Sequence, residues 1–172
     1  MPYLVIAIIF IIILSVIFSS FMPKIKTKKA YDELLSYLFR PRSCIYGISV
    51  EKIKNDIFDA KLNINSTHYY IKFLNIPAYS EIQINNKTTW ELKYGAKEQP
   101  GKAQPHKRYL SELSSFLGTD FGKNINKIII VFPKPKKIVK YINESEIIFV
   151  NSKTDLYGTR ILTKDNFGLF KK

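Results

Sequence analysis

The stretch TTWELKYG places an acidic residue and a lysine two positions apart, at Glu91 and Lys93. On a β-strand these two side chains share a face, because successive residues alternate between the faces. Cleavage of a phosphodiester with a metal ion needs carboxylates that hold Mg²⁺ and a lysine that orients or deprotonates the attacking water. A carboxylate on an earlier strand, Asp59 or Glu81, would complete such a site. The candidate catalytic residues are therefore Asp59, Glu91 and Lys93, and the candidate Mg²⁺ ligands are Asp59, Glu81 and Glu91.

Seven further polar residues are candidates for contacts with a nucleic acid: Gln104, His106, Lys107, Arg108, Lys134, Lys136 and Lys137. The first four surround the predicted start of a helix, where basic residues are less usual than at a helix C-terminus. The three lysines alternate with apolar residues, which indicates one charged face. Exposed faces of a lysine-rich chain would carry the same residues without any ligand, and this is the alternative explanation for both groups.

A mixed α/β domain is needed to position these residues. Apolar spacing predicts a helix over residues 30–40, then a mostly antiparallel meander of strands that start near residues 44, 56, 67, 80 and 88. Asp59 falls on the polar side of its strand. Residues 95–105 form a predicted loop, 106–118 an amphipathic helix and 126–132 a strand buried on both faces. A short basic helix or turn follows over 134–142, then a buried strand over 146–150 and a helical or irregular end.

The charge of the chain limits its partners. The formal net charge is +13, and because the first 22 residues carry no charged side chain, the excess lies after Met22. A polycation binds DNA, RNA or anionic lipid headgroups. A lysine-, isoleucine- and asparagine-rich composition would produce the same charge without such a partner. Cys44 is the only cysteine, which excludes an intrachain disulfide and a four-thiolate zinc site.

The first 22 residues form an apolar stretch that is long enough to span a bilayer as a helix. Lysines 24, 26, 28 and 29 follow it, and positive residues favour the cytoplasmic side. We therefore expect a single-pass protein of the cell membrane with its N-terminus outside. The predicted parts are a transmembrane anchor over 1–23, a basic juxtamembrane linker over 24–29 and a cytoplasmic domain over 30–172.

The order of these elements resembles the nuclease-related domain (NERD) family over about residues 28–161. FDAKLNINSTHYYIKFLN is similar to the family's strand with an aspartate and its following Glu-x-Lys strand, and EIQINNKTTW to its hairpin with a tryptophan, here Trp90. QPGKAQPHKRYLSEL is similar to the family's glutamine loop and helix, and KIIIVF to its late apolar strand. The resemblance implies a restriction-endonuclease-like fold, a mixed sheet flanked by helices, and Mg²⁺-dependent nuclease activity.

The resemblance fails at the catalytic positions. With Asp59 aligned to the family aspartate, the glutamate position falls on Lys72 and the lysine position on Leu74. This alignment keeps Trp90 in place and implies a family member that has lost catalysis. A second alignment instead pairs Asp59 or Glu81 with Glu91 and Lys93 in a shifted active site.

The favoured expectation is a membrane-anchored cytoplasmic domain that binds DNA or RNA without cutting it. One alternative is an active nuclease, which alone would require Mg²⁺ as a cofactor. Another is a membrane-proximal interaction or scaffold protein that binds anionic lipid headgroups.

Overall fold

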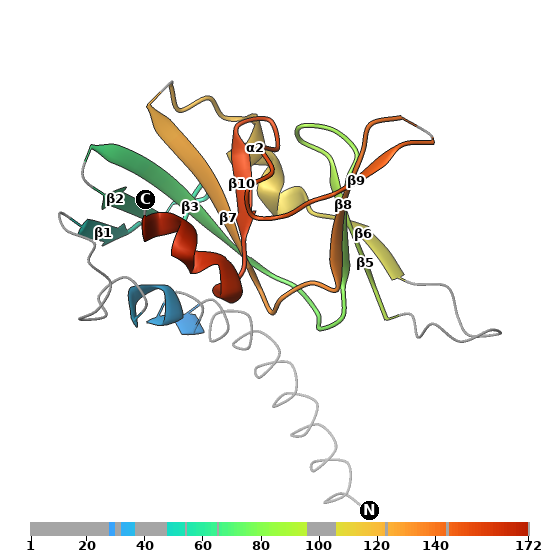
Figure 1. Cartoon of the computed structure of the whole chain (residues 1–172), viewed down its shortest axis with the longest axis horizontal. Coiled ribbons are helices and arrows are strands. Elements are labelled where there is room, and N and C mark those ends of the chain that lie inside the picture. Colours follow the sequence, from blue (N-terminus) through green and yellow to red (C-terminus); the bar gives the residue numbers. More distant parts are fainter. Residues whose placement is uncertain are drawn as a thin grey trace, which may run out of the picture.

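The computed structural model describes residues 28–29, 32–36, 48–53, 55–64, 66–95, 106–122, 124–143 and 145–171. These residues form two five-stranded mixed sheets that lie side by side, with few helices (Figure 1). The predicted anchor over 1–23 and the predicted loop residue Gln104 lie outside the described residues.

The first sheet has the strand order β1-β2-β3-β7-β10. Its strands are β1 (Ile48–Lys52), β2 (Ala60–Ile64), β3 (Thr67–Asn75), β7 (Ile125–Phe132) and β10 (Thr159–Leu162). The first three are antiparallel neighbours, whereas β3, β7 and β10 run parallel. Strand β7, between β3 and β10, is buried on both faces, which confirms the prediction from its apolar, β-branched sequence.

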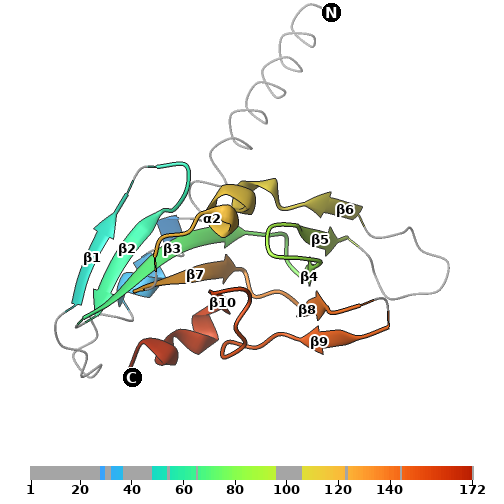
Figure 2. The same ribbon diagram turned by 90° about the horizontal axis from the view of Figure 1, so that it is seen from above.

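The second sheet has the strand order β6-β5-β4-β8-β9. Its strands are β4 (Glu81–Ile84), β5 (Trp90–Tyr94), β6 (His106–Tyr109), β8 (Lys137–Tyr141) and β9 (Ile147–Phe149). The parallel pair β3 and β7 of the first sheet leads into the parallel pair β4 and β8 of the second (Figure 2). The two sheets are therefore joined along the chain at several points.

One apolar cluster packs both sheets against the short helical segment η1 (Ser111–Leu113) and α2 (Ser114–Gly118). It contains Leu74 and Ile129 from the first sheet, Trp90 and Leu92 from the second, and Phe116 from α2. A second cluster covers the opposite face of the first sheet. There Leu34, in a helical segment over residues 32–36, and Phe167, in η2 (Lys164–Lys171), pack on β2, β3 and β7.

The predicted fold class is wrong for the described part of the chain. A restriction-endonuclease-like domain with one mixed sheet flanked by helices was expected, but β4, β5 and β6 form a second sheet together with β8 and β9. Among the helices of the described ranges, none is long and apolar enough to cross a membrane. Strand positions can be read from alternation, but the partner of each strand is set by packing, which the sequence pattern does not contain.

Three predicted elements are also corrected. Residues 106–109 are strand β6 and not the start of a helix, because they pair with β5 as the edge of the second sheet. Residues 137–141 are strand β8 and not a helix or turn, since β4 and β9 flank them. Strand β9 exists as predicted but is an exposed edge rather than a buried strand. In the first two cases sheet pairing outweighs local propensity.

Candidate functional site

Asp59 joins two strands of the first sheet. Its Oδ2 atom accepts a hydrogen bond of 2.7 Å from the backbone N–H of Phe73, and its Oδ1 atom lies 3.4 Å from Nζ of Lys72. Lys72 also donates to the backbone carbonyl of Asp56 at 3.2 Å. The Asp59 carboxylate is thus paired with a strand amide and a half-buried lysine. The charged side chain beside Asp59 is thus a lysine and not a second carboxylate.

Glu81, Glu91 and Lys93 lie on the outer face of the second sheet. Strand register places Glu81 opposite Lys93, and Glu91 opposite Gln83. Ile82 of β4 and Leu92 of β5, which alternate with these polar residues, are fully buried in the core. Because successive side chains of a strand point to opposite faces, Glu81, Glu91 and Lys93 point away from the core. The prediction that Glu91 and Lys93 share a face is therefore confirmed.

The predicted metal site does not assemble with Asp59. Asp59 precedes a strand of the first sheet, whereas Glu81 and Glu91 belong to the outer face of the second. Within the described residues there is no group of three or more His, Cys, Asp or Glu side chains that could hold a metal ion. Mg²⁺ binding through the shifted set Asp59, Glu81 and Glu91 has no support in this geometry.

Glu81 is held by neighbours on its own strand and on β8. Lys137 approaches it to 3.0 Å between Nζ and Oε2, and the Nε2 atom of Gln83 donates a hydrogen bond to its Oε1 atom at 2.9 Å. Burial raises the pKa of Glu81, but the hydrogen bonds from Gln83 and Lys137 and the positive charges of Lys137 and Lys93 outweigh it, so the pKa lies below its ordinary value. Glu81 is therefore a charged residue whose ion pair with Lys137 links β4 to β8.

Two of the predicted nucleic-acid contacts, Lys107 and Lys137, fall in one row across the outer face, together with Lys93, the predicted catalytic lysine. The row runs Lys107, Lys93, Glu81 and Lys137 over strands β6, β5, β4 and β8. The next row contains Tyr109 at one end and Phe149 at the other. Both aromatic side chains are 66% exposed. Lysines and exposed rings on one sheet face are a combination that can bind phosphates and stack on bases.

The other predicted contacts that the structure describes lie outside this row. Arg108 donates two hydrogen bonds to Glu112, at 3.2 and 2.9 Å, and alternation puts it on the opposite face of β6. Lys134 lies 2.8 Å from Asp165. Lys136 lies in the turn before β8, and the His106 ring lies against Tyr94 with 5.5 Å between the ring centroids.

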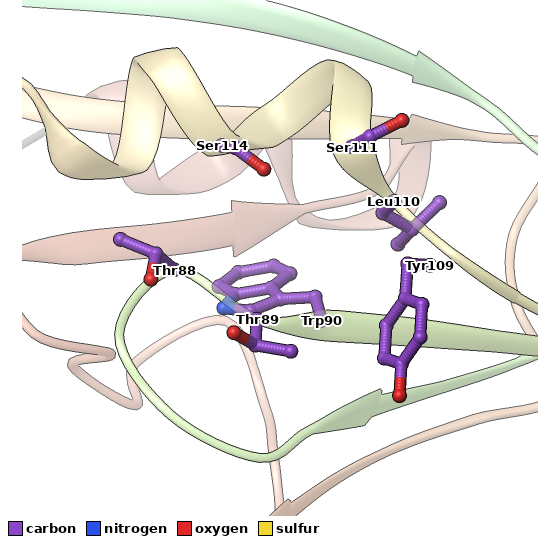
Figure 3. A pocket seen from close by; sticks show the side chains of 7 residues that line it. All are labelled: Thr88, Thr89, Trp90, Tyr109, Leu110, Ser111 and Ser114. Carbon is purple, nitrogen blue, oxygen red and sulfur yellow. The ribbon is translucent and has the colours of Figure 1, made fainter.

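A pocket beside this face was not anticipated from the sequence (Figure 3). It has a volume of about 250 Å³ and is lined by Thr88, Thr89, Trp90, Tyr109, Leu110, Ser111 and Ser114. The indole lies between the two threonines of the β4–β5 turn and the two serines of the helical segment (Figure 3). The strings TTW and YLSELSS already show the hydroxyl residues, but only the pairing of β5 with β6 brings them together.

The indole N–H of Trp90 is the unmet polar group of this pocket. Trp90 is 1% exposed, and its Nε1 atom has no hydrogen-bond partner among the described residues. A buried donor without an acceptor costs about 1–3 kcal/mol. Nε1 is also shielded from solvent, so an acceptor in the pocket reaches this donor only after a covering side chain moves.

Comparison of the chain with protein-family models, with curated proteins and with solved structures gives no significant match. The resemblance to the NERD family stays a prediction.

Proposed function

We propose that this domain binds nucleic acid and does not cleave it. The observation that carries the proposal is the outer face of the second sheet, where Lys93, Lys107 and Lys137 share a row and Tyr109 and Phe149 are exposed in the next. The net charge of +13 supports it, because a polycation attracts phosphates from a distance.

The partners and positions of the three carboxylates support nucleic-acid binding rather than catalysis. Asp59 is paired with Lys72 and with a backbone amide, and Glu81 with Lys137. Glu91 lies on the same outer face as Glu81 but on a different sheet from Asp59. The metal site predicted from the sequence needs at least two carboxylates that converge on the ion.

The proposal is tested by the salt dependence of binding. The full chain, kept in solution with a mild non-ionic detergent, is titrated into fluorescein-labelled single-stranded and duplex DNA while anisotropy is measured. If three lysines each neutralise one phosphate, the plot of log K against log salt for a single strand has a slope of about −2. This slope corresponds to roughly a 20-fold loss of affinity between 50 and 200 mM salt.

A charge-matched control separates the row of lysines from the net charge. For the triple variant Lys93→Gln, Lys107→Gln and Lys137→Gln, we expect the plot of log K against log salt to lose most of its slope. The control variant Lys28→Gln, Lys29→Gln and Lys153→Gln, at exposed positions away from this face, is expected to keep most of it. Equal losses in both variants, or binding to anionic vesicles as tight as binding to DNA, would contradict a nucleic-acid site on this face.

Cleavage is tested in the same preparation. Plasmid and single-stranded DNA are incubated with Mg²⁺ or Mn²⁺, and we expect no product. Cleavage that is abolished by Glu91→Ala would instead establish the shifted active site and overturn the non-catalytic proposal.

A further inference from the structure

The pocket at Trp90 has the chemistry of a site for a neutral, planar ligand. None of its seven lining residues carries a charge, whereas four of them are serines or threonines. A phosphate group in this space would have no lysine or arginine among its lining residues, so an anion is disfavoured. A ligand with hydrogen-bond acceptors would meet the hydroxyl groups of these serines and threonines.

Tyr109 connects the pocket with the face that carries the lysine row, whereas the Trp90 side chain lies on the core side of the sheet. Tyr109 lines the pocket and belongs to β6, opposite Glu91 on that face. Lys107 precedes it by two residues on the same strand and therefore points to the same side. A strand whose phosphates lie along the lysines therefore passes Tyr109, which borders both that face and the pocket.

We infer that the pocket accepts one unpaired nucleobase of a bound single strand. A base is neutral and planar and carries acceptors, and the exposed Tyr109 ring offers it a stacking surface. This inference rests on the proposed nucleic-acid binding. It specifies the class of nucleic acid that is bound, a strand with at least one unpaired base. Solvent does not reach Nε1 of Trp90, so a base acceptor pairs with it only if a covering side chain moves, and the inference does not depend on that hydrogen bond.

Trp90 itself reports on the pocket, since it is the only tryptophan of the chain. The full chain is titrated with a single-stranded oligodeoxythymidylate, with an abasic strand of the same length and with adenosine alone. Labelled-strand anisotropy measures binding, and Trp90 emission measures occupancy of the pocket. We expect both strands to bind, and Trp90 emission to change with the base-bearing strand and with adenosine but not with the abasic strand.

A matched pair of variants tests the location. Ser114→Leu places a larger side chain in the pocket, whereas Ser115→Leu makes the same change at the next exposed position of α2, outside the pocket lining. Because Ser114→Leu is expected to exclude one stacked base, we expect it to bind the base-bearing strand about 10-fold more weakly. Ser115→Leu is expected to bind normally and serves as the control for folding.

The outcomes separate the two proposals. Strand binding with no base-dependent change in Trp90 emission overturns the pocket and leaves the proposed function intact. Absence of strand binding with an adenosine response overturns the proposed function and supports the pocket as a nucleoside site. Absence of both signals overturns both proposals.

Discussion

Lys127 is a charged residue within the core, and its position is explained by the helix it faces. Its Nζ atom donates hydrogen bonds to the backbone carbonyls of Leu117 at 2.9 Å, Thr119 at 3.2 Å and Phe116 at 3.4 Å. The last carbonyls of a helix lack partners within it and carry partial negative charge. The lysine thus joins β7 to the end of α2, and its side chain stabilises both.

Replacing Lys127 by methionine is expected to destabilise the protein. The change preserves much of the apolar stem but leaves buried carbonyls without a donor, so we expect a loss of about 2 kcal/mol in the free energy of unfolding. Urea denaturation measures it. Lys153→Met, at an exposed position, is expected to change stability by less than about 0.5 kcal/mol. Equal stability of Lys127→Met and the parent protein would contradict this role.

The stability contribution of Lys127 depends on pH. Burial lowers the pKa of Lys127, the positive charge of Lys87 lowers it further, and Asp120 partly opposes both. Between this lowered pKa and the ordinary 10.5, the unfolded chain binds more protons than the folded one. Unfolding free energy of the parent protein, relative to Lys127→Met, should therefore rise with pH through this window. A difference that stays flat or falls would show that burial does not control the ionisation.

Asp59 makes a structural contribution that can be measured separately from any catalytic role. Asp59→Ala removes the acceptor of the Phe73 N–H and the partner of Lys72, and we expect a loss of about 1–3 kcal/mol in unfolding free energy. Asp56→Ala makes the same charge change at a nearby exposed residue and is expected to have little effect. Equal unfolding midpoints for the two variants would refute the strand-joining role.

At the scale of elements, the second sheet is held across its strands by the Glu81 carboxylate. Glu81 on β4 contacts Lys137 on β8 and faces Lys93 on β5. Its neighbours lower its pKa below the ordinary 4.5. A carboxylate with a lowered pKa stabilises the folded state above the unfolded pKa, and this contribution disappears as pH falls through the folded pKa.

Glu81→Gln is therefore expected to destabilise the protein at neutral pH but not at strongly acidic pH. The difference in unfolding free energy between the parent protein and the variant should begin to shrink once pH falls below about 4.5. Urea titrations at a series of pH values measure this difference. Glu112→Gln removes an exposed partner of Arg108 and serves as the comparison, with an expected effect at neutral pH of less than about 1 kcal/mol. A Glu81→Gln difference that is independent of pH would contradict the account.

At the scale of the whole molecule, the two sheets share one core. The larger apolar cluster contains Ile161 of β10 in the first sheet and Ile84 of β4 in the second. Neither sheet can lose this packing without exposing apolar surface of the other. We therefore expect the described domain to unfold as one cooperative unit.

Two substitutions on opposite sides of the core test this expectation. Ile84→Ala and Ile161→Ala should each cost about 2–4 kcal/mol and lower the same transition, whether it is followed by Trp90 emission or by far-ultraviolet circular dichroism. Ile147→Ala, at a side chain 46% exposed on β9, should have a much smaller effect. Trp90 emission that changes at lower urea than the circular dichroism would mean that the second sheet unfolds independently.

The sequence determined those features that depend on neighbouring residues along one strand or helix. The apolar run of β7 predicted burial on both faces, and the Glu91-Leu92-Lys93 spacing predicted a shared polar face, because alternation is a local property of an extended backbone. The net charge and its position after residue 22 are likewise readable without a structure.

Only the tertiary structure decided which elements meet. In the folded chain β8 pairs with β4, and residues 106–109 form an edge strand. Asp59 lies beside the first sheet, whereas Glu81 and Glu91 belong to the second. The tertiary structure also brought Thr88 and Thr89 of a turn against Ser111 and Ser114 of a helical segment to form the Trp90 pocket. Contacts between residues distant in the chain arise from the joint burial of apolar faces, and a local pattern specifies which face is apolar but not what covers it.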